Sequence, residues 1–257
     1  MIRIALVSYF NTRPFIDGLQ RRFAEGELEL KEVPPSGCAK LLHEGACDLA
    51  LVPVGALVDL LGLSIMRDHC LGADGKVDSV FLFSHVPIEQ ATAIVLDPHS
   101  RSSNGLAAVL LREYWNRELP AILPHGERFS QIQGTVCGVA IGDKAFAMKD
   151  QFPYVYDLAE VWKRYSGLPF VFAVWAYRPG SLKPEQLEAV RVALEDGRQG
   201  RRESAKRWAA DYGYSLEDAV YYLEQNISYE FDSAKHEAMK KYFRLLEQVL
   251  EQGALAV

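Results

Sequence analysis

Hydrophobic and polar positions predict alternating strands and helices through the first part of the chain. Residues 2–7 form a short apolar run rich in β-branched side chains, which is typical of a strand buried inside a sheet. Apolar residues between positions 15 and 23 then recur at helical spacing, so a helix is expected to begin near Thr12 or Arg13. Further strands are expected at residues 28–33 and 48–53, with a short helix between them.

A polar segment, residues 8–14, joins the first strand to the first helix. In an open α/β sheet, ligands bind where the carboxyl ends of strands meet the amino ends of helices. Free backbone N–H groups at a helix start favour an anion, and Asn11 adds an amide that both donates and accepts hydrogen bonds. The alternative is that Asn11 or Thr12 merely caps the helix.

The strand at residues 48–53 is apolar throughout, as in a strand covered on both faces of a parallel sheet. It ends at Pro53, Val54 and Gly55, which form a second strand-to-helix corner. The resulting β-α-β-α-β-α order is the pattern of a doubly wound sheet.

The rhythm changes in the middle of the chain. Residues 77–86 and 92–96 both read as strands, and no helix-sized gap separates them. We interpret this break as a crossing between two lobes, with the aromatic strand at 170–177 returning the chain to the first lobe. From Pro184 onward the sequence is helical almost throughout. The expected division is therefore residues 1–88 plus 176–257 for lobe I, and an inserted α/β unit at residues 89–175 for lobe II.

The second lobe has its own candidate corners. Residues 97–104 leave a strand and enter a helix, with Ser100, Ser102, Ser103 and Arg101 gathered at the helix start. Serine hydroxyls and backbone N–H groups can hold a carboxylate, and an arginine can pair with it bidentately. The alternative is a helix cap beside a surface ion pair worth at most about 1 kcal/mol.

Another strand, residues 136–141, ends at Gly142 and Asp143. The glycine suggests close approach of the backbone to another group, and the aspartate is a candidate cap for the following helix.

Composition limits the function classes. The 257 residues carry a net charge of −6, which argues against nucleic acid as the main partner. No apolar run approaches a membrane span, and the chain enters a strand at once without a signal-peptide pattern, so we expect a cytoplasmic protein. The 4 cysteines are scattered and are expected to be buried, reduced thiols, and the 6 histidines lack the spacing of a helical zinc site.

Motifs for nucleotide binding, serine-nucleophile hydrolysis and zinc catalysis are also missing. What remains is two α/β lobes whose corners offer amides, hydroxyls and arginines. The residues therefore point to a small anionic ligand, bound by an enzyme or by a binding protein.

Five segments together resemble the chorismate dehydratases of the futalosine route to menaquinone. Phe10 stands where an aliphatic residue is expected and Ser102 where threonine is usual, but neither change removes a polar group. The helical tail agrees only in length and class. The segments are residues 8–14, 48–53, 97–103, 140–143, and 156–158 with 167–175.

The resemblance implies a two-lobed type II periplasmic-binding-protein-like α/β fold with a ligand cleft between the lobes. It implies a lyase that removes water from chorismate to give 3-[(1-carboxyvinyl)oxy]benzoate, the first step of the futalosine route, without metal or organic cofactor. The implied partner is this small-molecule substrate, with no nucleic acid or membrane, and the protein would be a monomer or homodimer.

The same resemblance makes Asn11 the catalytic residue, which polarises or orients the substrate. No matched corner presents an evident histidine or carboxylate base, so the substrate's own enolpyruvyl carboxylate is expected to take the proton. Ser84 is a candidate carboxylate ligand, or else an ordinary strand-end hydroxyl. Pro53, Val54 and Ile141 would shape an apolar wall. The expected substrate-binding residues are Ser8, Thr12, Pro53, Val54, Ser84, Ser100, Arg101, Ser102, Ser103, Ile141 and Gly142.

Two other functions remain open on the same fold. One is a non-catalytic protein that binds a small anion. The other is the sister enzyme of the pathway, 1,4-dihydroxy-6-naphthoate synthase, which should depend more on a histidine base. His85 and His99 lie near enough to the candidate corners to keep that alternative open.

Overall fold

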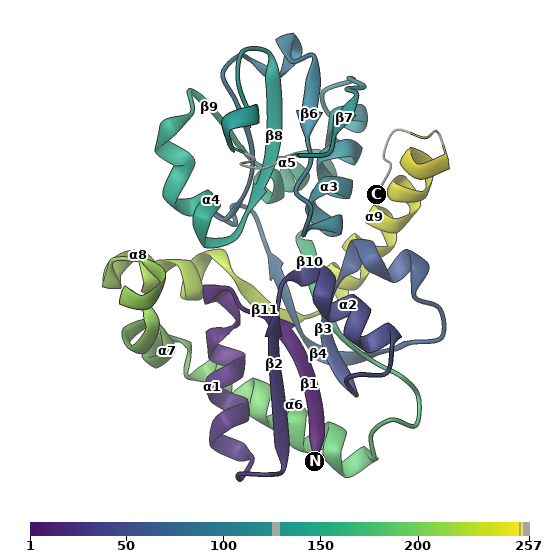
Figure 1. The fold of residues 1–257 in the computed structure, drawn as a ribbon, viewed down its shortest axis with the longest axis vertical. Helices are drawn as coiled ribbons and strands as arrows, with labels where there is room; N and C mark the ends of the chain where they lie inside the picture. Colours follow the sequence, from purple (N-terminus) through teal and green to yellow (C-terminus); the bar gives the residue numbers. More distant parts are fainter. Residues whose placement is uncertain (125–128, 252, 254–257) are drawn as a thin grey trace. The chain divides into compact units, whose positions relative to one another are not determined.

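Two sheets, each with its own helices, make up the chain in the computed structural model (Figure 1). The structure describes residues 1–124, 129–251 and 253. The chain divides into two compact units. Unit 1 is Met1–Gly72 with Val171–Asp232, and unit 2 is Ala73–Phe170 with Ser233–Val257.

Unit 1 contains a six-stranded sheet in the order β11-β4-β10-β3-β1-β2. Its strands are β1 (Ile2–Val7), β2 (Leu28–Val33), β3 (Leu49–Pro53), β4 (Ser64–Ala73), β10 (Phe170–Tyr177) and β11 (Ser228–Phe231). Its helices are α1 (Arg13–Arg22), α2 (Pro35–His43), α6 (Pro184–Gln199), α7 (Arg201–Trp208) and α8 (Leu216–Tyr221), with a 3-10 segment at Val54–Asp59 and a π-helical segment at Tyr222–Asn226. The strands expected at residues 2–7, 28–33 and 48–53 and the helix start at Arg13 are confirmed.

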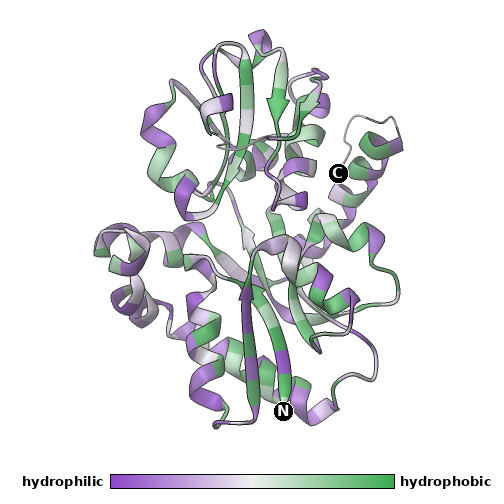
Figure 2. Cartoon of the chain, in the orientation of Figure 1, coloured by the Kyte–Doolittle hydropathy of each residue, from purple (hydrophilic) through white to green (hydrophobic). Residues whose placement is uncertain are grey.

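Burial explains the apolar runs of unit 1. β1 is parallel to both β2 and β3, and every residue of β3 is buried. Hydrophobic residues concentrate along β1 and β3, whereas β2 alternates with charged residues and α7 is largely hydrophilic (Figure 2). On one side α1 packs closely on α6, because a Cβ atom at Gly18 would lie 2.0 Å from the Ala193 carbonyl oxygen. The hydrophobic strands and the small residues between helices together build a core that fixes the ends of β1 and β3.

Unit 2 contains a five-stranded sheet in the order β7-β6-β8-β5-β9. Its strands are β5 (Val80–Ser84), β6 (Ala93–Val95), β7 (Ala121–Ile122), β8 (Val136–Ile141) and β9 (Tyr154–Asp157). Its helices are α3 (Arg101–Glu113), α4 (Gly142–Met148), α5 (Leu158–Ser166) and α9 (Ser233–Glu251). The last helix belongs here because Tyr242 is buried and its hydroxyl donates to the Ser102 carbonyl oxygen at 3.0 Å.

The structural division differs from the one expected from sequence. The chain passes from unit 1 to unit 2 at residues 72 and 73, inside β4, a strand that the sequence interpretation did not identify. It returns at residues 170 and 171, at the start of β10. The C-terminal helix, expected in lobe I, packs in unit 2, and its apolar stripe gives no indication of which sheet it covers.

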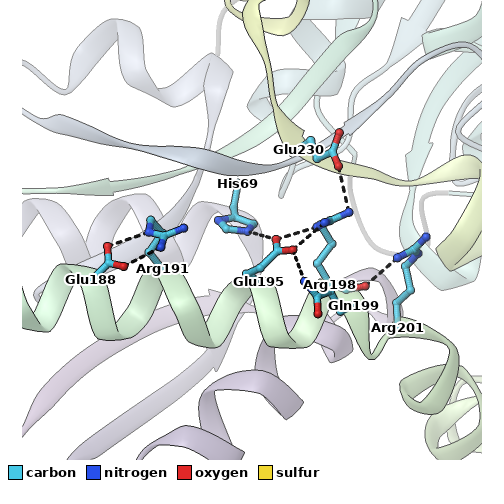
Figure 3. A network of polar contacts seen from close by, with 8 residues as sticks. All are labelled: His69, Glu188, Arg191, Glu195, Arg198, Gln199, Arg201 and Glu230. Atoms are coloured by element: carbon cyan, nitrogen blue, oxygen red, sulfur yellow. Dashed lines mark hydrogen bonds and ion pairs between the residues drawn. The ribbon is translucent and has the colours of Figure 1, made fainter.

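A polar network stabilises unit 1 away from the ends of its parallel strands (Figure 3). The buried His69 Nε2 lies 3.1 Å from Glu195 Oε2, and Arg198 donates to both oxygens of Glu195. Arg198 also forms an ion pair with Glu230 at 3.0 Å. The Arg198 hydrogen bonds, despite partial burial, lower the pKa of Glu195 to about 2. The network links α6 to β4 and β11, and all of its charges have partners.

The cysteine prediction is confirmed: Cys38, Cys47, Cys70 and Cys137 are buried and free. Burial raises the pKa of Cys38 and Cys137 to about 12, which keeps both as thiols at neutral pH. Among the described residues, no helix has both the length and the apolar character needed to cross a membrane.

Candidate functional site

In unit 1, two predicted corners meet at one edge of the sheet. β1 and β3 are parallel and adjacent, with Ile4 paired to Leu49 and Ala5 to Ala50. Their carboxyl ends therefore lie side by side, so the segment from Ser8 to Thr12 and the segment at Pro53 and Val54 share this edge. We call this set the unit 1 corner: Ser8, Asn11, Thr12, Pro53 and Val54.

Thr12 holds the turn of the unit 1 corner from inside. Its side chain is fully buried, and its hydroxyl lies 2.6 Å from the Val7 carbonyl oxygen and 2.7 Å from that of Tyr9. The single hydroxyl proton is thus used within the turn. Ser8 is exposed, and its carbonyl oxygen accepts from the Tyr212 hydroxyl at 3.3 Å. Neither contact is a helix cap of the expected kind, because no side chain caps α1.

Asn11 is held at two points by tyrosines from the other end of the chain. Its side-chain Nδ2 donates to the Tyr222 hydroxyl at 3.2 Å. Its backbone carbonyl oxygen accepts from the Tyr229 hydroxyl at 2.8 Å. The buried Asn11 Oδ1 has no hydrogen-bond partner among residues 1–124, 129–251 and 253. An unsatisfied buried acceptor is costly, so this oxygen is a candidate contact for a ligand.

An aromatic stack surrounds the Asn11 backbone. The Phe10 ring lies 4.8 Å from Tyr214 and 6.1 Å from Tyr222, nearly parallel to both. This explains why an aromatic residue stands at position 10, where an aliphatic one was expected: Phe10 is fully buried among tyrosine rings. Sequence reasoning missed these tyrosines because they follow Asn11 by about two hundred positions, and the local pattern there indicates only helix.

Arg13, the other polar residue of the first turn, is occupied by neighbours. Its guanidinium pairs with Glu32, donates to the Tyr212 hydroxyl, and lies 5.1 Å from the Trp208 ring centroid. It therefore orders the edge of unit 1 rather than presenting a free cation to the corner.

In unit 2, a second pair of corners meets at the carboxyl ends of β6 and β8, which are parallel neighbours. Ser100 is the N-cap of α3, and its hydroxyl oxygen accepts from the Ser103 N–H at 3.3 Å. The hydroxyl of Ser100 thus caps the helix, as the simpler alternative predicts. We call this set the unit 2 corner: Ser100, Arg101, Ser102, Ser103, Ile141 and Gly142.

The loop before α3 is fixed by a reciprocal pair of hydrogen bonds. The Asn104 side chain accepts from the Asp97 N–H at 2.9 Å and donates to the Asp97 carbonyl oxygen at 2.8 Å. The serines at positions 100, 102 and 103 are buried, and Arg101 is half-buried in the first turn. The Ser103 and Asn104 N–H groups both donate to Ser100, and an ordered helix start of this kind favours an anion through the positive end of the helix dipole.

Gly142 turns the chain sharply from β8 into α4. Its φ of 74° lies in the left-handed region, and its N–H donates to the Ser79 carbonyl oxygen at 2.8 Å. Asp143 lies in the first turn of α4, while Ile141 occupies the N-cap position. The prediction that Asp143 caps this helix is therefore wrong, because the helix begins one residue earlier, at the glycine.

Ser79 is a residue of this edge that sequence reasoning missed. It is buried and directly precedes β5, whose Val80 pairs with Ile141. The neighbouring Val77 and Asp78 N–H groups both donate to Asp157, and burial raises the pKa of that carboxyl to about 6. The sequence does show a serine at the start of a predicted strand. Only the antiparallel register with β8 shows that this end of β5, rather than the other, reaches the corner.

The structure does not bring Ser84 together with the other predicted residues. In the antiparallel pair of β5 and β8, Val80 lies opposite Ile141, and Ser84 is four positions further along β5. At about 3.3 Å per residue, Ser84 lies roughly 13 Å from the unit 2 corner, at the opposite edge. Its hydroxyl accepts from the Val86 N–H at 3.2 Å, as an ordinary strand-end hydroxyl would.

The two histidines differ in position. His85 is exposed and follows Ser84 at the far edge, where its ring lies 5.2 Å from Phe152. His99 is exposed beside the start of α3, with its N–H donating to Asp97 at 2.9 Å. His99 is thus the histidine near a corner. Within the described part of the chain, no group of three or more His, Cys, Asp or Glu residues is arranged to hold a metal ion.

Comparison with known proteins assigns the family. Residues 2–248 match the family model described as menaquinone biosynthesis. The chain belongs to the menaquinone biosynthesis family. Within the curated proteins, it is 28% identical to the chorismate dehydratase of Thermus thermophilus over 263 residues, covering 95% of this chain and 94% of that protein.

Solved structures confirm the fold expected for this family. A protein of Archaeoglobus fulgidus superimposes with a TM-score of 0.77 at 15% identity, covering 99% of this chain and 98% of that one. The alkanesulfonate-binding protein of Xanthomonas axonopodis pv. citri, bound to MOPS, gives a TM-score of 0.66 at 12% identity, with 100% and 94% covered. A Candida albicans protein described as having the generic periplasmic binding protein fold gives 0.62 at 12% identity, with 100% and 91% covered. The two-lobed periplasmic-binding-protein-like α/β fold is therefore established.

Proposed function

We propose that this member of the menaquinone biosynthesis family is a chorismate dehydratase. The observation that carries the proposal is at the unit 1 corner, where two tyrosine hydroxyls hold Asn11 and its side-chain Oδ1 has no hydrogen-bond partner among the described residues. The similarity to the Thermus thermophilus enzyme along nearly the whole chain supports it. Fold alone does not, since the same fold serves binding proteins.

The proposed reaction is an elimination that breaks one ring C–H bond and one C–O bond. The proton leaves the ring carbon that bears the enolpyruvyl ether, the hydroxyl leaves the adjacent carbon as water, and the ring becomes aromatic. No electrons pass to a carrier, so the chemistry itself needs no redox cofactor. Deprotonation spreads negative charge toward the ring carboxylate, so donors at that carboxylate stabilise the transition state more than the ground state.

The residues of the two corners suit these demands. In unit 2, the start of α3 and Arg101 are proposed to bind a carboxylate, and Gly142 is proposed to let the backbone approach the substrate closely. In unit 1, Asn11 is proposed to orient the ring, with Ser8, Pro53 and Val54 lining its surroundings. No histidine or carboxylate of the unit 1 corner is placed to remove the proton, so the enolpyruvyl carboxylate of the substrate is the proposed base. Ser84 is left out, because it lies at the opposite edge of its sheet.

The test is to incubate the purified protein with chorismate after chelation of metals and to separate the products by chromatography. We expect 3-[(1-carboxyvinyl)oxy]benzoate to accumulate far faster than in a control without protein. Thermal stabilisation by chorismate without turnover would instead identify a binding protein for this class of anion. No product and no stabilisation would refute chorismate as the ligand.

Whether a protein histidine acts as the base, as expected for the sister enzyme, is tested at His99, the histidine that lies beside a corner. Because the proposed dehydration uses no protein histidine, His99→Ala should change kcat/KM for chorismate by less than about twofold. Loss of chorismate turnover in this variant would indicate a histidine base and contradict substrate-assisted proton removal.

A further inference from the structure

The side-chain amide of Asn11 has two chemically different ends, and the structure gives them different surroundings. Nδ2 donates to the Tyr222 hydroxyl, whereas Oδ1 lacks a partner in the described residues. An amide that rotates by 180° exchanges its donor and acceptor with almost no change in shape. A phenol hydroxyl could accept from Nδ2 or donate to Oδ1; in the structure it accepts from Nδ2, which leaves Oδ1 as the acceptor that Asn11 offers a substrate.

Tyr222 is placed for this task by an unusual piece of backbone. It is the first residue of the π-helical segment Tyr222–Asn226, and the Ile227 N–H donates to its carbonyl oxygen at 3.0 Å. π-Helical turns are rare in proteins, and those that occur are often found at functional sites. The Tyr222 ring is nearly parallel to those of Phe10 and Tyr214, 6.1 and 5.6 Å away, which fixes the position of its hydroxyl.

Tyr229 completes the arrangement after the π-helical turn. It lies in β11, its side chain is buried, and its hydroxyl donates to the Asn11 carbonyl oxygen. Burial raises the pKa of this phenol well above its ordinary value, so it stays a donor at neutral pH. One tyrosine thus fixes the Asn11 backbone and the other fixes the amide plane.

We infer that Tyr222 is a positioning residue that holds Nδ2 of Asn11 and so presents Oδ1 as a hydrogen-bond acceptor for the substrate's hydroxyl group. The inference rests on the proposed function. At neutral pH both carboxylates of chorismate are acceptors, and its ring hydroxyl is the donor that can meet Oδ1. When that hydroxyl receives a proton and leaves as water, its remaining O–H becomes a stronger donor, so the contact strengthens during the reaction.

A double-mutant cycle tests whether Tyr222 acts through Asn11. Tyr222→Phe keeps the ring in the stack and removes only the hydroxyl. We expect kcat for chorismate to fall about tenfold or more, with KM within about threefold, and we expect the same substitution to have no further effect in the Asn11→Ala background. Equal losses in both backgrounds would overturn the inference. Tyr214→Phe is the matched control, because Tyr214 shares the stack without a hydrogen bond to Asn11 in the described structure.

A second readout does not depend on turnover. In ¹⁵N-labelled protein, the side-chain NH₂ signals of Asn11, assigned with Asn11→Asp, should shift in Tyr222→Phe and stay in place in Tyr214→Phe. Unchanged signals in Tyr222→Phe would overturn the inference whatever the activity. If the wild type fails to convert chorismate but the signals shift, the proposed function is wrong. Tyr222 would then still position the Asn11 amide, but Oδ1 would not be an acceptor for the chorismate hydroxyl. If Tyr222→Phe does not fold, Tyr222→Leu supplies the same comparison, because leucine is buried as readily and has no hydrogen-bonding group.

Discussion

The unit 1 and unit 2 corners occupy the same place in their sheets but use different chemistry. At the unit 1 corner, the Thr12 hydroxyl is used within the turn and the neighbouring Arg13 pairs with Glu32, while Oδ1 of Asn11 lacks a partner in the described residues. At the unit 2 corner, three buried serines and Arg101 stand at the start of α3, and Gly142 turns the end of β8 into α4. Under the proposed function, the first corner would act through a single oriented side chain, and the second through a helix start suited to an anion.

Under the proposed function, this difference predicts how sensitive each corner should be to substitution. A backbone site for a carboxylate tolerates changes of individual hydroxyls, because several N–H groups share the charge. A site built on one amide has no such reserve. We therefore expect the effects of substitutions to be concentrated at unit 1 and distributed at unit 2.

The largest effect is expected at Asn11. Asn11→Ala should lower kcat for chorismate by about 100-fold or more, as is usual when one transition-state hydrogen bond is removed, with little change in melting temperature. Steady-state kinetics and thermal unfolding measure both. Gln20→Ala, an exposed amide on α1, is the matched control and should match the wild type. Similar activities for all three proteins would remove Asn11 from the chemistry.

A smaller loss is expected at Arg101. Arg101→Ala removes a bidentate partner for a carboxylate, which is worth about 1.5–3 kcal/mol, so kcat/KM should fall about 10- to 100-fold, mostly through KM. Arg101→Lys should recover part of the lost kcat/KM, because lysine keeps the positive charge but lacks the two parallel N–H donors of the guanidinium. A loss in kcat alone, with KM unchanged, would contradict a binding role for Arg101.

The two ends of β5 offer a matched comparison. Ser79→Ala keeps the backbone contact with Gly142 but removes a hydroxyl at the unit 2 corner, and should lower kcat/KM about five- to tenfold, whereas Ser84→Ala, at the far edge, should leave it within about twofold. Both serines are buried, so both variants should lose about 1 kcal/mol of stability. Kinetics and urea unfolding separate the two quantities. The reverse order of activities would show that the strand register misplaces the corner.

The smallest effect on activity is expected in the polar network of unit 1, which touches neither corner and is tested through stability instead. The pKa of Glu195, about 2, lies below its ordinary value, so the stability it confers is fully present above about pH 4.5 and is lost as pH falls toward 2. Between pH 6 and pH 3, the wild type should lose up to about 2 kcal/mol relative to Glu195→Gln, since the carboxylate is partly exposed. Urea unfolding at several pH values measures this difference. A constant difference across the range would show that Glu195 is not stabilised in its ionised form.

Local pattern was enough to place the strands that end at the two corners. Apolar runs and turn residues located β1, β3 and β8 and the start of α1, because these features depend on neighbouring residues. The capping role of Ser100 also followed from its place before a helix.

Local sequence pattern does not predict how distant strands and helices pair with one another. Ser84 and Ser79 stand at opposite ends of one strand, and only its pairing with β8 shows which end meets Gly142. The tyrosines that hold Asn11 follow it by 211 and 218 positions, so no local spacing links them. The C-terminal helix has an apolar stripe that would suit either sheet, and packing through Tyr242 decides between them.

The most direct measurement is a proton NMR time course of chorismate mixed with the wild-type protein or with Asn11→Ala. For the wild type we predict that the ring olefin signals give way to aromatic signals while the vinyl signals of the enolpyruvyl group remain, because water is lost and the ether is kept. Asn11→Ala should show the same products at least about 100-fold more slowly. Loss of the vinyl signals, equal rates for the two proteins, or no change with either would contradict dehydration of chorismate at these corners.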